Sequence, residues 1–294
     1  MRMRRLFPKL FSSLMVVTLF SAMTATSVSA TEIHSQKLNS PGVVVEIFSY
    51  NEYEAAMEAA RTSRTADSIE DVHKQFSDYV YELQANKTET ELAELGYSDE
   101  QISLIKNYDG SQDIVSLFSA SVSVTNSVSN YKYNSSTNKT SADIKFGFTW
   151  NGTAAHIYED VLAVAWSEGF YCTSTADMSI TCTYKSNRND TKMSFSAPSS
   201  SPSVKKDTVN TGNTSAKFTF DKHFGSRMRL YSATGTVHLE KTGRVPEFSV
   251  LVSYGEAQKS VSPSFSVSAG GPSVSVSFVS GVSEIAKNLS KYSL

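Results

Sequence analysis

Residues 118–125 (FSASVSVT) and 144–150 (IKFGFTW) decide the fold class of this chain. In both stretches, apolar side chains alternate with small or polar ones. Because successive side chains of a β-strand point to opposite faces of a sheet, each stretch predicts a strand with one buried and one wet face. Residues 161–166 (VLAVAW) are apolar throughout, as in a central strand. Short runs of this kind, separated by turn residues, predict an antiparallel β-sandwich over residues 111–294.

The chain in front of this region has a different character. Residues 31–110 contain 16 acidic and 6 basic residues, a net charge of −10, whereas residues 111–294 contain 13 acidic and 17 basic ones, a net charge of +4. Apolar residues recur at helical spacing over 69–83, and Ser98 with Gln101 has the spacing of a capping box. We expect a small acidic α-helical segment over 31–110. It is either a permanent subdomain or a pro-region. Its negative charge has two equally weighted interpretations: docking on the positively charged β part, or the acidic surface that is common among helices.

The first 30 residues have the three-part layout of a secretory signal. Arg2, Arg4 and Arg5 form a basic head, residues 10–23 form an apolar stretch, and Val28-Ser29-Ala30 places small residues at a cleavage position. The apolar stretch is shorter than the roughly 20 residues that a membrane-spanning helix needs. We expect a signal peptide over residues 1–30, a secreted protein, and no integral membrane segment after its removal.

One short motif carries a family resemblance. Residues 95–102 (LGYSDEQI) resemble a short helical motif in poorly characterised exported proteins of Gram-positive bacteria. The resemblance covers this motif and the order of signal, acidic helices and β domain. It implies an exported protein and brings with it no activity and no site residues.

The chain has two cysteines, Cys172 and Cys182. If the residues between them form a short hairpin centred on Asp177, the two sulfurs face each other on one side of it. In an oxidising compartment such a pair is expected to close as a disulfide. The alternatives are two free buried thiols or a reactive cysteine.

A basic cluster is the main candidate for a binding site. It comprises Lys217, Lys222, His223, Arg227 and Arg229. If the two arginines share a strand face, the cluster can meet an anionic cell-wall polymer or a lipid surface. The other interpretations are docking of the acidic helices and a solvated sheet edge. Few aromatic residues lie among these cations, so we expect no nucleic-acid partner.

The end of the β domain carries an amphipathic hairpin. Across Ser260–Phe278, serines alternate with apolar residues on both sides of a Gly270-Gly271-Pro272 turn. The pattern resembles the membrane-inserting hairpins of β-barrel pore-forming toxins, and it is equally typical of an ordinary sheet with one wet face. Beyond it, Val282, Ile285 and Leu289 have helical spacing and predict a short closing helix.

Local motifs for catalysis are missing from the sequence. His156 with Glu159 and Asp160 is the densest titratable cluster, and it motivates a secreted hydrolase as a third hypothesis. The five histidines have no zinc-ligand spacing, so we expect neither a metal site nor a cofactor. We therefore favour a secreted, non-catalytic protein that binds at, or has a structural role in, a cell surface or envelope. The alternative is a membrane-active pore-forming toxin that inserts Ser260–Phe278.

Overall fold

The structure is a computed structural model of the chain. It describes residues 34–37, 43–62, 69–110, 115–152, 159–186, 191–209, 214–225, 228–257, 262–280 and 282–294. The predicted signal peptide lies outside these residues. Within them, none of the helices has both the length and the apolar character needed to cross a bilayer.

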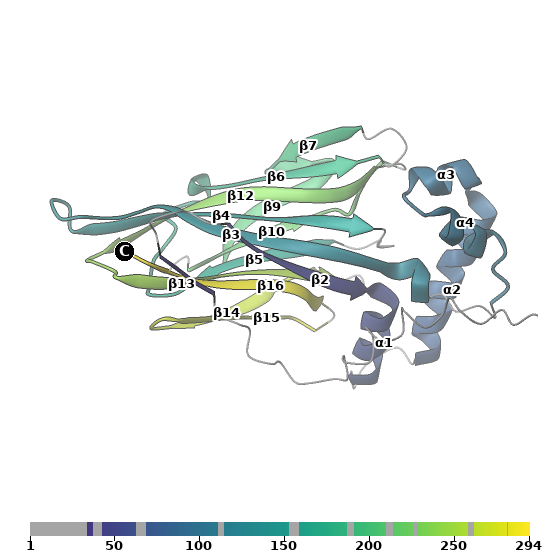
Figure 1. Cartoon of the computed structure of the whole chain (residues 1–294), viewed down its shortest axis with the longest axis horizontal. Coiled ribbons are helices and arrows are strands. Elements are labelled where there is room, and N and C mark those ends of the chain that lie inside the picture. Colours follow the sequence, from purple (N-terminus) through teal and green to yellow (C-terminus); the bar gives the residue numbers. More distant parts are fainter. Residues whose placement is uncertain are drawn as a thin grey trace, which may run out of the picture. The chain divides into compact units, whose positions relative to one another are not determined.

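Two largely antiparallel sheets face each other and enclose the main core, which confirms the predicted β-sandwich (Figure 1). The first sheet has the order β1-β16-β13-β5-β10-β9-β8, with β1 parallel to β16. The second has the order β2-β3-β4-β12-β6-β7, and β11 pairs with β12. The first sheet consists of β1 (His34–Lys37), β5 (Asp160–Trp166), β8 (Ser199–Ser200), β9 (Ser203–Val209), β10 (Ser215–Phe220), β13 (Glu247–Ala257) and β16 (Val282–Ser293). The second consists of β2 (Val44–Asn51), β3 (Ser119–Asn134), β4 (Lys139–Gly152), β6 (Met178–Lys185), β7 (Lys192–Ser196), β11 (His223–Phe224) and β12 (Met228–Thr242).

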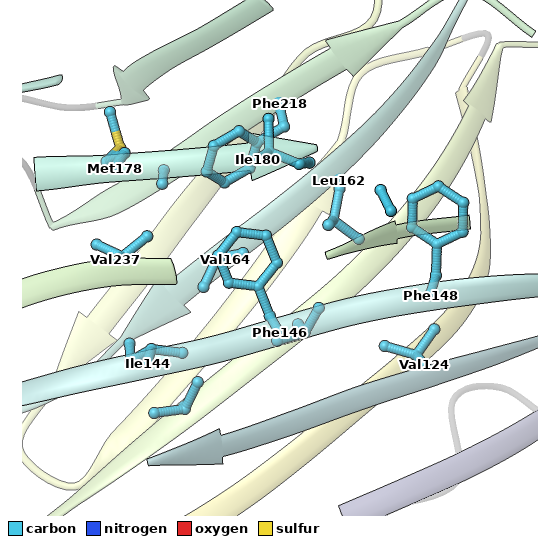
Figure 2. Packing of buried hydrophobic residues seen from close by; sticks show 14 of the residues in the cluster. Val124, Ile144, Phe146, Phe148, Leu162, Val164, Met178, Ile180, Phe218 and Val237 are labelled. Atoms are coloured by element: carbon cyan, nitrogen blue, oxygen red, sulfur yellow. The ribbon is translucent and has the colours of Figure 1, made fainter. Parts of the chain in front are cut away.

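Aromatic rings from both sheets fill the space between them (Figure 2). The ring centres of Phe146 in β4 and Phe218 in β10 are 5.0 Å apart, and those of Phe148 and Tyr254 are 4.6 Å apart. These are the distances at which aromatic pairs add to the stability of a core. The alternating residues of 144–150 therefore point inward as the sequence predicts.

The described residues also contain four helices and two short 3-10 turns. They are α1 (Glu52–Thr62), α2 (Ile69–Asn86), α3 (Glu89–Glu94), α4 (Asp99–Lys106), η1 (Val115–Phe118) and η2 (Thr175–Asp177). Ser98 and Gln101 form the expected capping box of α4, and Asn51 Oδ1 accepts a hydrogen bond from the Glu54 amide at the start of α1. The helices enclose their own apolar cluster, which includes Phe118 at the end of η1, with its ring centre 4.7 Å from that of Phe76. The acidic segment supplies β1 and β2 as well, so it contributes strands to both sheets.

The predicted closing helix is wrong, because Val282–Ser293 is the strand β16. Tyr254 pairs with Ala286 and the next residue, Gly255, pairs with Glu284, so Ile285 is an extra residue that bulges from β16. A bulge shifts the phase of the alternation by one position. The apolar residues before and after it consequently take the spacing of a helix, although the backbone continues along the ladder with β13.

The terminal hairpin forms a third layer. Strands β14 (Phe265–Gly270) and β15 (Ser273–Phe278) pair with each other as a separate two-stranded sheet. Their apolar side chains pack against the outer face of the first sheet, on Val161, Ala163 and Ala165 of β5. The opposite side chains of β5 enter the main core. The uninterrupted apolar run of β5 thus has a core on each face.

Candidate functional site

Three basic side chains lie in one row across neighbouring strands of the second sheet. Arg229 in β12 pairs with Lys185 at the end of β6 and, on its other side, with His223 in β11. Directly paired residues share a face of the sheet and have Cβ atoms about 4.5–5.5 Å apart. The register therefore gathers positive charge at one place on this sheet.

A β-bulge adds an aromatic ring to this row. Leu230 pairs with Tyr184 and Ser232 with Thr183, so Tyr231 is the extra residue on β12. Bulges re-aim side chains and are common beside functional sites. The Nζ atoms of Lys185 and Lys192 lie 5.5 Å and 5.0 Å from the centre of the Tyr231 ring. Both distances fall within the range of a cation–π contact.

The basic row and Tyr231 line a cavity of about 50 Å³, together with Trp150, Gly152, Lys222 and Leu230. That space holds a few water molecules or one small polar group. A guanidinium, an ammonium and an imidazole around it offer several N–H donors, which is the arrangement that binds a carboxylate or phosphate oxygen. The pocket can thus bind an anionic group.

Lys222 has a different role from the one the sequence suggests. Its ammonium pairs with Glu256 and lies 3.5 Å from Asp160 Oδ2, and both carboxylates are fully buried. Tyr50 donates a hydrogen bond to Glu256, and Tyr254 donates one to Asp160. Burial and the adjacent Asp160 raise the pKa of Tyr254 well above its ordinary value. Lys222 therefore acts as the counter-ion of buried acids, where removing it would leave charge uncompensated.

Lys217 is not part of this pocket. Lys217 lies in β10 opposite Ala163 of β5 and Asp207 of β9, in the first sheet. Arg227 lies outside the described residues. Of the predicted cluster, the structure brings together Lys222, His223 and Arg229.

Arg229 also joins the helices to the sheet. Its guanidinium lies 5.3 Å from the centre of the ring of Tyr97, which follows α3. Burial alone would lower the pKa of Arg229, but Tyr97, Tyr79 and the carboxylate of Glu52 raise it. Docking of the helices and lining of the basic pocket are thus two roles of one side chain.

The predicted disulfide does not form in this fold. Cys172 and Cys182 are both free and buried. Tyr171 bridges to Glu240 of β12, whereas Cys182 pairs with Ala233 of the same strand. At about 3.3 Å per residue, these two positions are roughly 20 Å apart, and a disulfide needs Cα atoms within about 7 Å.

The chemistry of both cysteines follows from their burial. The expected hairpin between them is replaced by the 3-10 turn η2, whose cap is Ser174. Burial raises the pKa of the Cys182 thiol to about 12 and that of Cys172 above its ordinary value. Both are therefore poor nucleophiles at neutral pH.

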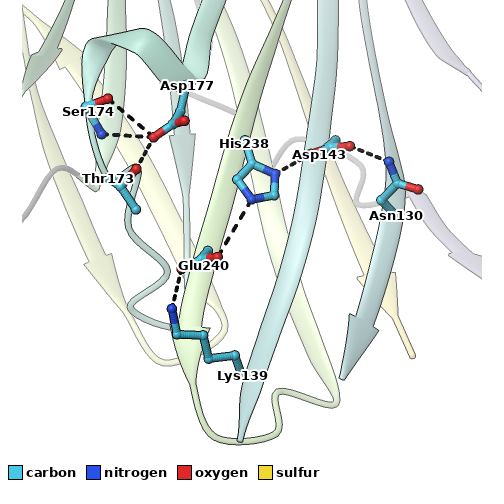
Figure 3. Close-up of polar contacts among 8 residues, drawn as sticks. All are labelled: Asn130, Lys139, Asp143, Thr173, Ser174, Asp177, His238 and Glu240. Carbon is cyan, nitrogen blue, oxygen red and sulfur yellow. Dashed lines mark hydrogen bonds and ion pairs between the residues drawn. The ribbon is translucent and has the colours of Figure 1, made fainter. Parts of the chain in front are cut away.

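A histidine–carboxylate pair does form, but away from the predicted hydrolase residues (Figure 3). His238 Nδ1 lies 2.6 Å from Asp143 Oδ1, and its Nε2 lies 4.0 Å from Glu240 Oε1. The hydroxyls of Thr173 and Ser174 bond to Asp177 instead. Among the contacts drawn in Figure 3, none therefore joins His238 to a hydroxyl that it could activate.

The predicted hydrolase cluster is separated in the same way. His156 lies outside the described residues. Glu159 lies 3.5 Å from Lys205, and Asp160 is held in the buried ionic cluster. A carboxylate that is fully buried and shared with a lysine and a tyrosine is positioned for packing rather than for proton transfer to a substrate.

Sequence reasoning missed Lys185, Trp150 and Tyr231 as pocket residues. Lys185 looks like the polar end of a strand, and Trp150 looks like a core residue. Only the pairing of β6 with β12 places Lys185 beside Arg229. The bulge at Tyr231 has no signature in the local sequence.

No protein-family model and no curated protein matches the chain. Among solved structures, it is similar to the collagen-binding subdomain of the Enterococcus faecalis surface protein ACE (9% identity, TM-score 0.28, 53% of this chain and 88% of that one). It is also similar to Clostridium perfringens delta-toxin (10%, 0.27, 58% and 83%) and to the collagen-binding domain of a Staphylococcus aureus adhesin (11%, 0.30, 52% and 88%). At these identities and TM-scores, the likenesses carry no argument about function.

Proposed function

We propose that the protein is a secreted, non-catalytic binding protein that acts at a cell surface and holds an anionic group in the pocket of Lys185, His223 and Arg229. The observation that carries this proposal is the row of three basic side chains, aligned by strand register beside the bulged ring of Tyr231. The export signal in the sequence motivates the location. The predicted ligands are an anionic wall polymer or a lipid surface, which share negatively charged oxygens.

The size of the pocket limits what part of the ligand it takes. A cavity of about 50 Å³ accepts one oxyanion and excludes a whole polymer unit. Arg229 supplies a planar fork of donors and Lys185 a single point charge, a combination suited to phosphate or carboxylate oxygens. The rest of the ligand then lies outside the pocket, where Lys192 and the Tyr231 ring contact each other.

Binding assays with a matched control test the proposal. The probes are phosphatidylglycerol vesicles, phosphatidylcholine vesicles, a purified phosphate-containing wall polymer and inorganic phosphate, each at low and at high salt. We expect Lys185→Gln to lower the affinity about tenfold, because a hydrogen bond to a charged group contributes roughly 1.5–3 kcal/mol. Lys205→Gln is the control, since Lys205 lies in β9, 63% exposed and paired with Glu159.

The pattern of binding identifies the source of the anion. Binding to the anionic vesicles alone assigns the pocket to a lipid head group, and binding to the polymer alone assigns it to the cell wall. Screening by salt weakens either one. Equal affinities of Lys185→Gln and Lys205→Gln for every probe would refute the pocket as the binding site.

A further inference from the structure

The β14–β15 hairpin is attached to the molecule mainly by the packing of its side chains. Its two strands hydrogen-bond to each other, and in the described residues they join neither large sheet as a ladder strand. The turn is tied at two points: the Glu168 amide donates to the Gly271 carbonyl at 3.1 Å, and the Ser249 hydroxyl donates to the Pro272 carbonyl at 2.7 Å. The hairpin can therefore leave the sheet without breaking a ladder.

The surface beneath the hairpin is shaped to receive it. The apolar face of the hairpin covers Ala163, Ala165 and Leu251. Gly255 of β13 is part of this floor, and a Cβ built there would lie 2.7 Å from the Phe278 ring. Small residues thus leave room for a third layer. When the hairpin leaves, its own apolar face must be covered by something else.

The hairpin differs from the rest of the surface in charge. Residues 260–283 contain no Asp, Glu, Lys, Arg or His, in a chain that is 19% charged. Its exposed face consists of serines, and Ser266 pairs with Ser277 and Ser268 with Ser275. Charged side chains are what makes insertion of a strand into lipid most costly. The polar face of the hairpin therefore has no charge, and within a bilayer such a face is tolerated where it lines a water-filled space.

The length of the hairpin is close to what a bilayer requires. β14 and β15 have six residues each, and the described residues beside them extend the arms to 262–270 and 273–280, nine and eight positions. A tilted strand crosses the hydrocarbon core with about 9–11 residues. Over residues 260–269, serine alternates without a break with Val, Pro, Phe, Val and Ala. The same alternation that docks the hairpin on β5 gives it one lipid-facing side after release.

We propose that β14–β15 is a releasable hairpin that leaves the outer face of β5 and β13 at a lipid surface and inserts into the bilayer. The apolar face of Phe265, Val267, Val276 and Phe278 then contacts acyl chains. Backbone groups and serines within lipid need partners. Several copies must therefore stand side by side, with their serine faces around water. This activity rests on the hairpin and does not depend on the basic pocket.

A reversible lock tests the release step. In Ser249→Cys/Pro272→Cys, one thiol replaces the hydroxyl that bonds to the Pro272 backbone and the other is attached to that same residue, so oxidation ties the turn to β13. The native cysteines are buried and do not compete. Thiol counting verifies the lock, and the readout is dye release from vesicles of phosphatidylcholine with phosphatidylglycerol. We expect the oxidised form to release dye at least tenfold more slowly than the same protein after reduction.

A pair of surface substitutions tests insertion independently of the lock. Ser268 and Ala269 are neighbours in β14 and both are exposed, so a lysine at either position leaves the folded protein unchanged. They point to opposite faces of the hairpin. We expect Ala269→Lys to slow dye release at least fivefold, because it places a charge toward lipid, and Ser268→Lys to retain release.

The outcomes decide the proposal. The proposal is supported if the locked form releases dye more slowly, and if Ala269→Lys slows release but Ser268→Lys does not. Equal release by the oxidised and reduced forms, or equal effects of the two lysines, overturns it. Absence of dye release by the unmodified protein also overturns it, whether or not the protein binds the vesicles. Binding without release leaves the function proposed for the basic pocket in place.

Discussion

The β14–β15 hairpin and the β4–β12 pair have the same alternating sequence pattern and different attachments. β12 is hydrogen-bonded to β4 on one side and to β6 on the other, and its outer face carries His238 and Glu240. The hairpin is bonded within itself, and its outer face carries serines. The comparison teaches that alternation predicts which face of a strand is wet. It does not predict whether the strand belongs to a continuous sheet.

The largest effect is expected in the core between the two sheets. Phe148 is 2% exposed and packs against Phe220 and Tyr254. Phe148→Ala should lower the free energy of unfolding by about 3–5 kcal/mol, since it removes a large buried side chain and leaves a cavity. Urea denaturation measures this. A loss below about 1 kcal/mol would contradict the two-sheet core.

A smaller effect is expected in the hairpin. Phe265 is 4% exposed and covers Val161 and Ala163. Phe265→Ala should cost roughly 1.5–3 kcal/mol, the value of burying one such side chain. The loss should be local, so limited proteolysis should cleave within residues 262–280 first. If Phe265→Ala destabilises the protein as much as Phe148→Ala does, the hairpin is part of the main core and the comparison fails.

The contact between Gly255 and Phe278 sharpens the comparison further. Gly255→Ala places a methyl group against the ring and should cost about 1–2 kcal/mol through overpacking. In Phe278→Ala, where the ring is gone, the same change should cost almost nothing. A double-mutant cycle on urea unfolding measures the difference. Additive losses would show that the ring does not lie on Gly255.

The smallest effect concerns the charges on the outer face of β4 and β12. Burial opposes ionisation of Asp143, but hydrogen bonds from His238 and Asn130 lower its pKa below the ordinary value. A lowered carboxyl pKa stabilises the fold above the unfolded-state pKa, and this stability is lost as pH falls through the folded-state pKa. Asp143→Asn should therefore reduce stability at neutral pH by about 0.2–1 kcal/mol. The difference from the unmodified protein should begin to shrink near pH ~4, the ordinary Asp value, and vanish only below the lowered folded-state pKa of Asp143.

Thermal unfolding across this range measures the effect of Asp143→Asn. Lys205→Gln is a suitable control, since Lys205 lies in the first sheet. A difference between Asp143→Asn and the unmodified protein that persists at low pH would assign the loss to packing instead of to the ionised carboxyl.

Much of the fold is readable from local patterns. The alternation in 118–125 and 144–150, the double-sided apolar run of β5 and the capping box at Ser98 all appear where the sequence predicts them. These features depend on neighbours in the chain. The closing helix expected from Val282, Ile285 and Leu289 is wrong because the bulge at Ile285 gives the apolar residues of β16 a helical spacing.

The site is less readable, because it depends on pairing between distant strands. The register that sets Lys185 beside Arg229 joins residues that are far apart in sequence. The two cysteines show the reverse case. They are close in sequence, but the strand pairing places them beside different parts of β12, near Glu240 and Ala233. Lys222 lies near Arg229 in the chain, but two buried carboxylates determine its role.

Native-state hydrogen exchange tests the central claim most directly, because it measures the opening of each segment in the intact protein. We predict that the amides of β14 and β15 exchange through a local opening, much faster than those of β4 and β12, and that Phe265→Ala accelerates the exchange of the hairpin alone. Equal protection of the hairpin and the β4–β12 pair, with one common opening step, would contradict a separately attached third layer.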